Sequence, residues 1–322
     1  MAVIYSNDFK PSLGLINPHV QTIYPSLFRN VEGVTYSRER IETPDSDFLD
    51  LDWSVKGNDK LAVVLHGLEG SSDRPYIKGM VLALNQGGFD AVSMNMRGCS
   101  GENNRFLYAY HSGKTEDLET VIQHIQNKYS YSEISLIGFS LGGNLIIKYV
   151  GEKGNNIASQ ITKMVAVSAP NNLQACSEKL TQLTNFPYNW KFVNDLIRKS
   201  IEKGYEGPKT GRVIRKDQVK TVIDFDFWFT APVHGFESAW EYYRLNSGEH
   251  FIENVKVKSL LITAQNDPFL TEVCFPIKQT KSHKYVDLEI TRHGGHVGFM
   301  PSLFSLTFWH ESRVMKFLLE GV

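Results

Sequence analysis

The sequence predicts an α/β fold in which a mostly parallel central sheet is covered by helices on both faces. Continuous apolar runs at 61–65, 164–170 and 257–264 are typical of strands that are buried on both faces. Helical periods lie between such runs, as at 76–86 and 116–128. Strands that alternate with helices pair in parallel, because each helix returns the chain to the same end of the sheet.

The chain begins with a proline-rich arm, residues 1–32, which we expect to be ordered but irregular and to wrap onto the domain. Residues 33–43 and 48–55 alternate between polar and apolar side chains on either side of a polar turn, which predicts an antiparallel hairpin. The other predicted elements of the core are strands at 89–95, 134–137 and 286–291 and a terminal helix at about 309–319.

The segment from about 171 to 255 differs from the rest of the chain. It has helical periods but no clean buried strand, and it is rich in aromatic residues. We therefore divide the chain into a first core part at 1–170, a helical cap insertion at 171–255 and a second core part at 256–322. Residues 224–229 alternate, so that one side of this stretch can carry aromatic rings while the other meets water.

The cap aromatics have two interpretations. They can line a substrate pocket, with Trp228 and Phe229 as contacts, or they can form only the small core of the cap. We expect the pocket.

Composition excludes several classes of partner. The chain has 322 residues and a net charge of -1, so it offers no positive electrostatic field that would attract nucleic acid.

The three cysteines are far apart, which favours a reducing compartment over a disulfide framework. They do not have the spacing of metal ligands. Neither a signal peptide nor a membrane span is apparent, so we expect a cytoplasmic protein without stable membrane insertion. These features leave the oligomeric state open.

The most informative stretch is Gly138-Phe139-Ser140-Leu141-Gly142, which follows a predicted strand and begins a predicted helix. This is the pattern of a nucleophile elbow. The two flanking glycines avoid collisions on a strained turn, and the turn lifts the Ser140 hydroxyl above the end of the sheet. Ser140 is therefore the candidate nucleophile.

A serine nucleophile needs a base and a group that orients the base. Asp267 follows the strand 257–264, and His296 follows the strand 286–291, so both fall at the edge where the serine is expected. Alternatives remain. Asp267 could cap a helix, His293 competes with His296 as the base, and the two histidines could belong to a metal site. We favour His296, because Gly294 and Gly295 give its loop reach, and we expect no metal.

An oxyanion needs two backbone N–H groups. We expect one from Leu141, just after the nucleophile, and one from Leu68 in the glycine-rich loop after the strand 61–65. His66 in the same loop is interpreted chiefly as a brace, with a substrate contact as the alternative. Arg97 is expected to tie its turn to neighbouring loops, and Cys99 to be a packing residue.

These residues resemble the α/β-hydrolase superfamily, and longer strings resemble the branch that holds the bacterial YheT-type hydrolases, the plant embryogenesis-associated hydrolases and the mammalian abhydrolase-domain lipases. The resemblance extends to the arm, in Asn17-Pro18-His19-Val20-Gln21-Thr22. The other strings that carry it are His66-Gly67-Leu68-Glu69-Gly70-Ser71-Ser72, Asn95-Met96-Arg97-Gly98-Cys99-Ser100-Gly101-Glu102, Tyr110-His111-Ser112-Gly113, Gly138-Phe139-Ser140-Leu141-Gly142-Gly143-Asn144, Ala231-Pro232-Val233-His234-Gly235-Phe236 and Gly294-Gly295-His296-Val297-Gly298-Phe299. One departure is Asn266, where relatives often carry a second Asp.

The resemblance implies an α/β-hydrolase fold and a Ser140–His296–Asp267 charge relay that cleaves carboxylic esters, as in esterases and lipases. It implies a small-molecule ester or lipid as the substrate, and no cofactor. Two alternatives remain, an acyltransferase that uses the same three residues and a non-catalytic binding protein on a hydrolase scaffold.

Overall fold

The computed structural model describes residues 3–203 and 217–321. These residues form one nine-stranded sheet with the order β1-β9-β8-β7-β6-β4-β5-β3-β2. All neighbouring pairs are parallel except β3 with β2 and β3 with β5, so the predicted mostly parallel sheet is confirmed. The strands are β1 (Val3–Ser6), β2 (Ser37–Glu42), β3 (Phe48–Ser54), β4 (Lys60–Leu65), β5 (Asp90–Asn95), β6 (Glu133–Phe139), β7 (Ile161–Val167), β8 (Lys258–Ala264) and β9 (Val286–Thr291).

Helices cover both faces of the sheet, as predicted. Apolar side chains of α3 and α4 pack on one face, and those of α2 and α11 pack on the other. The central strands β4, β6, β7 and β8 are mostly apolar because they meet a helix layer on each side. The helices are α1 (Pro18–Phe28), α2 (Pro75–Gln86), α3 (Thr115–Lys128), α4 (Leu141–Lys153), α5 (Leu173–Leu180), α6 (Phe186–Glu202), α7 (Val222–Phe225), α8 (Ala231–His234), α9 (Ala239–Asn246), α10 (Ile277–Thr280) and α11 (Trp309–Glu320).

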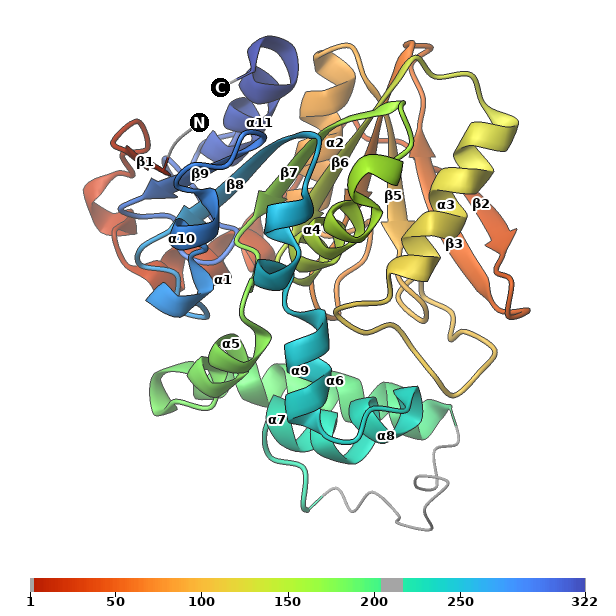
Figure 1. Cartoon of the computed structure of the whole chain (residues 1–322). Coiled ribbons are helices and arrows are strands. Elements are labelled where there is room, and N and C mark those ends of the chain that lie inside the picture. Colours follow the sequence, from red (N-terminus) through yellow and green to blue (C-terminus); the bar gives the residue numbers. More distant parts are fainter. Residues whose placement is uncertain (1–2, 204–216, 322) are drawn as a thin grey trace.

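The chain between β7 and β8 forms a helical cap. Helices α5 to α9 lie together below the sheet in Figure 1. They bury a small core of their own, in which Val193 and Ile197 of α6 pack with Phe225 and Phe229. The helical cap that the sequence indicates is therefore present, and its boundaries at residues 170 and 256 stay predictions.

The arm is more regular than the sequence suggested. β1 adds to the edge of the sheet by parallel pairing with β9, and α1 is an eleven-residue helix. The Asn17 side chain accepts hydrogen bonds from the amides of His19 and Val20. Pro18 occupies the first helical position, where the N–H that proline lacks would have no partner inside the helix. Expecting an irregular arm was wrong, because Pro18 starts a helix rather than breaking one.

Candidate active site

Ser140 lies on a strained turn between β6 and α4. Its backbone φ is +52°, an uncommon value for a residue with a side chain. A Cβ atom on Gly138 would lie 2.4 Å from the carbonyl oxygen of Gly142, and one on Gly142 would lie 2.6 Å from the carbonyl oxygen of His66. Both positions need glycine, so the physical reason for the elbow pattern is present in the structure.

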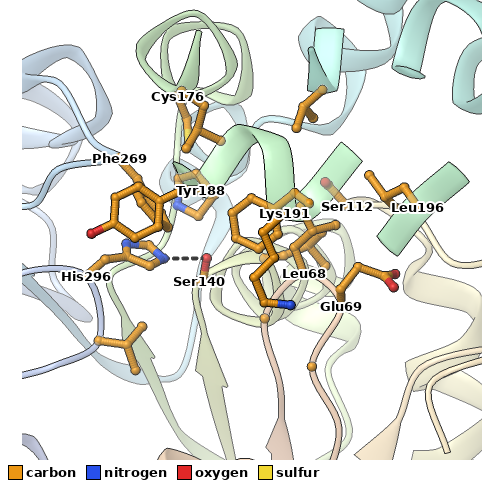
Figure 2. Close-up of a pocket in the computed structure, with 18 of the residues that line it drawn as sticks. Leu68, Glu69, Ser112, Ser140, Cys176, Tyr188, Lys191, Leu196, Phe269 and His296 are labelled. Atoms are coloured by element: carbon orange, nitrogen blue, oxygen red, sulfur yellow. Dashed lines mark hydrogen bonds between the residues drawn. The ribbon is translucent and has the colours of Figure 1, made fainter. Parts of the chain in front are cut away.

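The structure brings Ser140, His296 and Asp267 together. Oγ of Ser140 is 2.8 Å from Nε2 of His296, as the dashed line in Figure 2 shows. On the other side of the ring, Nδ1 of His296 is 2.8 Å and 3.1 Å from the two carboxylate oxygens of Asp267. A proton on Nδ1 satisfies the carboxylate and leaves Nε2 as the acceptor that faces the serine hydroxyl.

The competing assignments for these residues do not match the geometry. Asp267 is buried and also accepts the amide of Phe269 at 2.8 Å, but no helix begins there. His293 is not among the residues that line the cavity beside Ser140. Among the described residues, no group of three or more His, Cys, Asp or Glu side chains could hold a metal ion.

The loop that carries His296 is held by helix α1. The amide of His296 donates to Oγ1 of Thr22 at 2.9 Å. The buried Gln21 side chain donates to the carbonyl of Met300 at 3.0 Å and accepts the amide of Met300 at 2.7 Å. A Cβ atom on Gly298 would lie 2.1 Å from the carbonyl oxygen of Gln21, so helix and loop are in close contact. Sequence reasoning missed this role of the arm.

The two amides predicted to bind an oxyanion lie beside the nucleophile. Leu68 and Leu141 both line the cavity with Ser140, and a Cβ atom on Gly67 would lie 3.1 Å from Cβ of Ser140. Within the described part of the chain neither amide meets a hydrogen-bond acceptor. The Leu141 amide belongs to the first turn of α4, where N–H groups have no partner inside the helix. Both N–H groups are therefore without an acceptor, and their role as oxyanion donors stays a prediction.

His66 does not reach the cavity. Its Nδ1 donates to the carbonyl of Gly67 at 2.7 Å, and its Nε2 accepts the amide of Met96 at 3.1 Å. Burial lowers the pKa of the His66 imidazole to about 4, so the ring is neutral at pH 7. Both ring nitrogens are used to brace two loops, and the alternative of a substrate contact for His66 was wrong.

Phe229 lines the cavity, whereas Trp228 does not. Trp228 packs on the small core of the cap, with its ring centroid 5.2 Å from that of Phe227. The stretch is helical rather than extended, since a π-helical turn at Asp226–Thr230 joins α7 to α8. The rings of Phe225 and Phe229 therefore stack at 4.9 Å on one side of the helix, and placing Trp228 in the pocket was wrong.

Aromatic rings of the cap and of the loop after β8 line the cavity together with Ser140 and His296. The cavity has a volume of about 460 Å³ and a mostly apolar lining, within the usual size of a small-molecule site. The ring centroid of Phe269 lies 4.2 Å from that of His296, and the ring centroid of Tyr188 in α6 lies 4.7 Å from that of Phe269 (Figure 2). Neither contact was predicted, because the first depends on how the loops after β8 and β9 pack together and the second on how the cap sits over the core.

Arg97 and Cys99 have the supporting roles that their turn suggested. The guanidinium of Arg97 binds Asp45 at 2.7 Å and Asp117 at 2.7 Å, and also contacts Asp47 at 3.2 Å. Cys99 is a buried free thiol in the main core. Arg97 therefore ties its turn to the hairpin and to α3, as expected.

Comparison with known proteins identifies the family. The sequence profile described as "alpha/beta hydrolase fold" matches residues 62–302 of this chain. The chain belongs to the α/β-hydrolase family. YheT of Escherichia coli (strain K12), whose esterase name is provisional, is 35% identical over 97% of this hydrolase and 93% of YheT.

Other relatives of the hydrolase agree with the branch that the motifs indicate. The embryogenesis-associated protein EMB8 of Picea glauca is 29% identical over 94% of the hydrolase and 70% of EMB8. Phospholipase ABHD3 of Mus musculus is 27% identical over 99% of the hydrolase and 80% of ABHD3. Among solved structures, the Pyrococcus furiosus esterase Pf2001 matches with a TM-score of 0.60 and 18% identity, over 96% of the hydrolase and 98% of Pf2001, which shows the shared fold.

Proposed function

We propose that this protein is a serine hydrolase that cleaves carboxylic esters through an acyl-enzyme intermediate. The observation that carries the proposal is the continuous hydrogen-bonded chain from Ser140 through His296 to the buried Asp267, placed at the wall of an apolar cavity. This arrangement supplies a nucleophile, a base and a group that orients the base. The provisional esterase name of YheT and the phospholipase name of ABHD3 support the same chemistry.

In the first half of the proposed reaction, Oγ of Ser140 attacks the ester carbonyl carbon while Nε2 of His296 takes the hydroxyl proton. The carbonyl oxygen becomes an oxyanion, which the amides of Leu68 and Leu141 receive. Asp267 keeps the imidazole oriented and stabilises its charged form. Collapse of the tetrahedral intermediate breaks the ester C–O bond, and the proton on Nε2 passes to the departing alcohol.

In the second half, a water molecule gives a proton to Nε2 of His296, and its oxygen attacks the acyl carbon. Collapse of the second tetrahedral intermediate breaks the bond to Oγ of Ser140 and returns the proton to Oγ. The carboxylic acid leaves and the serine is free again. These steps use only side chains, backbone amides and water.

The cavity supports esters with an apolar acyl group as substrates. Its lining is mostly apolar, and the cap contributes the rings of Tyr188, Phe192, Phe225 and Phe229. Burying each methylene of an acyl chain stabilises the bound ester by about 0.8 kcal/mol.

Among the described residues no helix is long and apolar enough to cross a membrane. We expect the substrate to be a small ester or a single lipid, met in the cytoplasm.

The test is hydrolysis of p-nitrophenyl esters from acetyl to palmitoyl by wild type and Ser140→Ala. We expect wild type to prefer one range of chain length, and Ser140→Ala to lose activity on the order of 10⁴-fold. The variant should keep its fold, because the strain of the elbow lies in the backbone. Turnover by Ser140→Ala close to wild type would contradict the proposal. Adding alcohol acceptors measures acyl transfer, and a product that is mostly a new ester would favour the acyltransferase.

A further inference from the structure

The loop that carries Leu68 makes a tight turn with an unusual third residue. The amide of Gly70 donates to the carbonyl of Gly67 at 3.0 Å, and Glu69 between them has a φ of +52°. This left-handed conformation is unfavourable for a residue with a side chain, and glycine or asparagine is the usual choice there. A buried glutamate in this position therefore indicates that its side chain has a task.

One carboxylate oxygen of Glu69 fixes the backbone of the turn. The amide of Glu69 donates to the hydroxyl of Tyr110 at 2.8 Å, and the same hydroxyl donates to Oε1 of Glu69 at 2.7 Å. The carbonyl of Glu69 accepts a hydrogen bond from Arg74 at 2.7 Å. The two peptide groups that follow Leu68 are thus held in place, one residue away from the Leu68 amide that we assign to the oxyanion site.

The other carboxylate oxygen contacts the cap. Nζ of Lys199, in helix α6, lies 2.9 Å from Oε2 of Glu69. The side chain of Glu69 is 5% exposed and that of Lys199 is 23% exposed, so bulk water screens this ion pair only weakly. Removing one member of such a pair leaves the other charge buried and unbalanced. The contact therefore joins the loop that carries Leu68 firmly to the cap.

Helix α6 also reaches the base side of the site. The ring centroids of its residues Tyr188 and Phe192 lie 4.7 Å and 6.0 Å from that of Phe269. The ring of Phe269 in turn packs against that of His296. The first half of α6 thus packs near the base, and its last turn holds Glu69 (Figure 2 shows Tyr188, Phe269 and Glu69 around Ser140). A cap that sits correctly on the core orders both halves of the site.

We propose that Lys199 is a positioning residue: through its ion pair with Glu69 it couples the placement of cap helix α6 to the orientation of the Leu68 amide in the oxyanion site. The inference rests on the proposed ester hydrolysis and adds to it a link between the cap and transition-state stabilisation. Lys199 also lines the cavity, and its Nζ lies 3.3 Å from Sγ of Cys99, but the role that we assign to it includes no proton transfer.

The test compares Lys199→Met, which keeps most of the aliphatic stem, with Lys199→Arg, which keeps the charge. Active sites are first titrated with a fluorophosphonate, so that kcat refers only to folded, reactive enzyme. We expect kcat per site of Lys199→Met to fall about 10- to 100-fold. This loss is no larger than the 10²–10³-fold loss that accompanies complete removal of an oxyanion donor, because the amide is misplaced and not removed. KM should change much less, and Lys199→Arg should recover most of kcat.

A matched control lies on the same helix. Arg198 is exposed, pairs with Asp195 at 3.0 Å and does not line the cavity. Arg198→Met should leave kcat per site unchanged. Glu69→Gln removes the charge from the other side of the same ion pair. The double variant with Glu69→Gln and Lys199→Met should therefore have a kcat no lower than that of the more severe single variant.

The possible results are separable. Equal kcat per site for Lys199→Met and wild type would overturn the positioning role and leave ester hydrolysis intact. A loss that Lys199→Arg does not recover, or losses that multiply in the double variant with Glu69→Gln, would also overturn it. If wild type neither hydrolyses esters nor reacts with the fluorophosphonate, the proposed function itself has failed.

Discussion

The amide of His296 donates a hydrogen bond to Oγ1 of Thr22 at 2.9 Å, so helix α1 holds the candidate base from a point 274 residues away in the chain. Oγ1 of Thr22 in turn donates to the carbonyl of Pro18 at 2.7 Å. The arm is therefore part of the site and does more than cover the domain. This contact leads to the first prediction.

Thr22→Val replaces the hydroxyl by a methyl group and leaves the His296 amide without its acceptor. We expect kcat to fall about 10-fold, because a small misplacement of a catalytic group is enough for a loss of that size or greater. Steady-state kinetics on a p-nitrophenyl ester measure it. Thr22→Ser keeps the hydroxyl and should be near wild type. If both variants behave alike, the hydroxyl does not position the base.

His296→Ala should disable the enzyme about as severely as Ser140→Ala, because the nucleophile then has no base. His293→Ala should retain activity, since His293 does not line the cavity. Ester hydrolysis by the two purified variants decides between them. An inactive His293→Ala beside an active His296→Ala would mean that the base is wrongly assigned.

Phe229→Ala should change the preferred acyl length, because its ring lines the cavity. Each methylene that the pocket buries should raise kcat/KM several-fold until the pocket is full, since about 0.8 kcal/mol accompanies each one. Trp228→Ala is the matched control in the adjacent position, and it should lower thermal stability while keeping the length preference. The ester series and a thermal melt of both variants measure this. The reverse pattern would place the acyl group elsewhere.

Asp226 should make the stability of the protein depend on pH. Burial raises the pKa of its carboxyl to about 6, and the hydroxyl of Tyr243 donates to it at 2.7 Å. Because the pKa is raised above that of the unfolded chain, the stability that this group contributes is present at low pH and is lost as pH rises through about 6. Asp226→Asn removes this titration.

We therefore expect Asp226→Asn to gain free energy of unfolding over wild type as pH rises from about 4 to 6, by up to about 3 kcal/mol. Above that interval the gain should stay constant. Urea unfolding of both proteins at pH 4.5, 6 and 8 measures the difference. A difference between the two proteins that does not vary with pH would show that Asp226 titrates alike in the folded and unfolded chain.

Local features made much of the site predictable. The glycines around Ser140 are required by backbone contacts within the elbow, and Asp267 and His296 follow strands whose ends must meet at one edge of the sheet. The arm could not be assigned in this way, because β1 pairs with β9 and Gln21 binds Met300, both far away in sequence. A residue that caps a helix just before a proline, as Asn17 does, is the signal that could have revealed α1.

The pocket was harder to predict than the three polar residues. Alternation at 224–229 indicates two sides only in an extended chain, and the π-helical turn rotates Trp228 away from the cavity while Phe229 stays in it. His66 follows a buried strand, where site residues gather, yet its two ring nitrogens are used by Gly67 and Met96. The side of a helix on which a residue lies, and the hydrogen-bond partners of a loop residue, depend on tertiary packing, which the local sequence does not determine.

The central claim is that Ser140 is a nucleophile activated by His296. The most direct measurement is the intact mass of the protein after reaction with a fluorophosphonate, followed by peptide mapping. The account predicts one covalent adduct per chain, on the peptide that contains Ser140, and none within the same time for Ser140→Ala or His296→Ala. An unlabelled wild type, or an adduct that persists in Ser140→Ala, would contradict it.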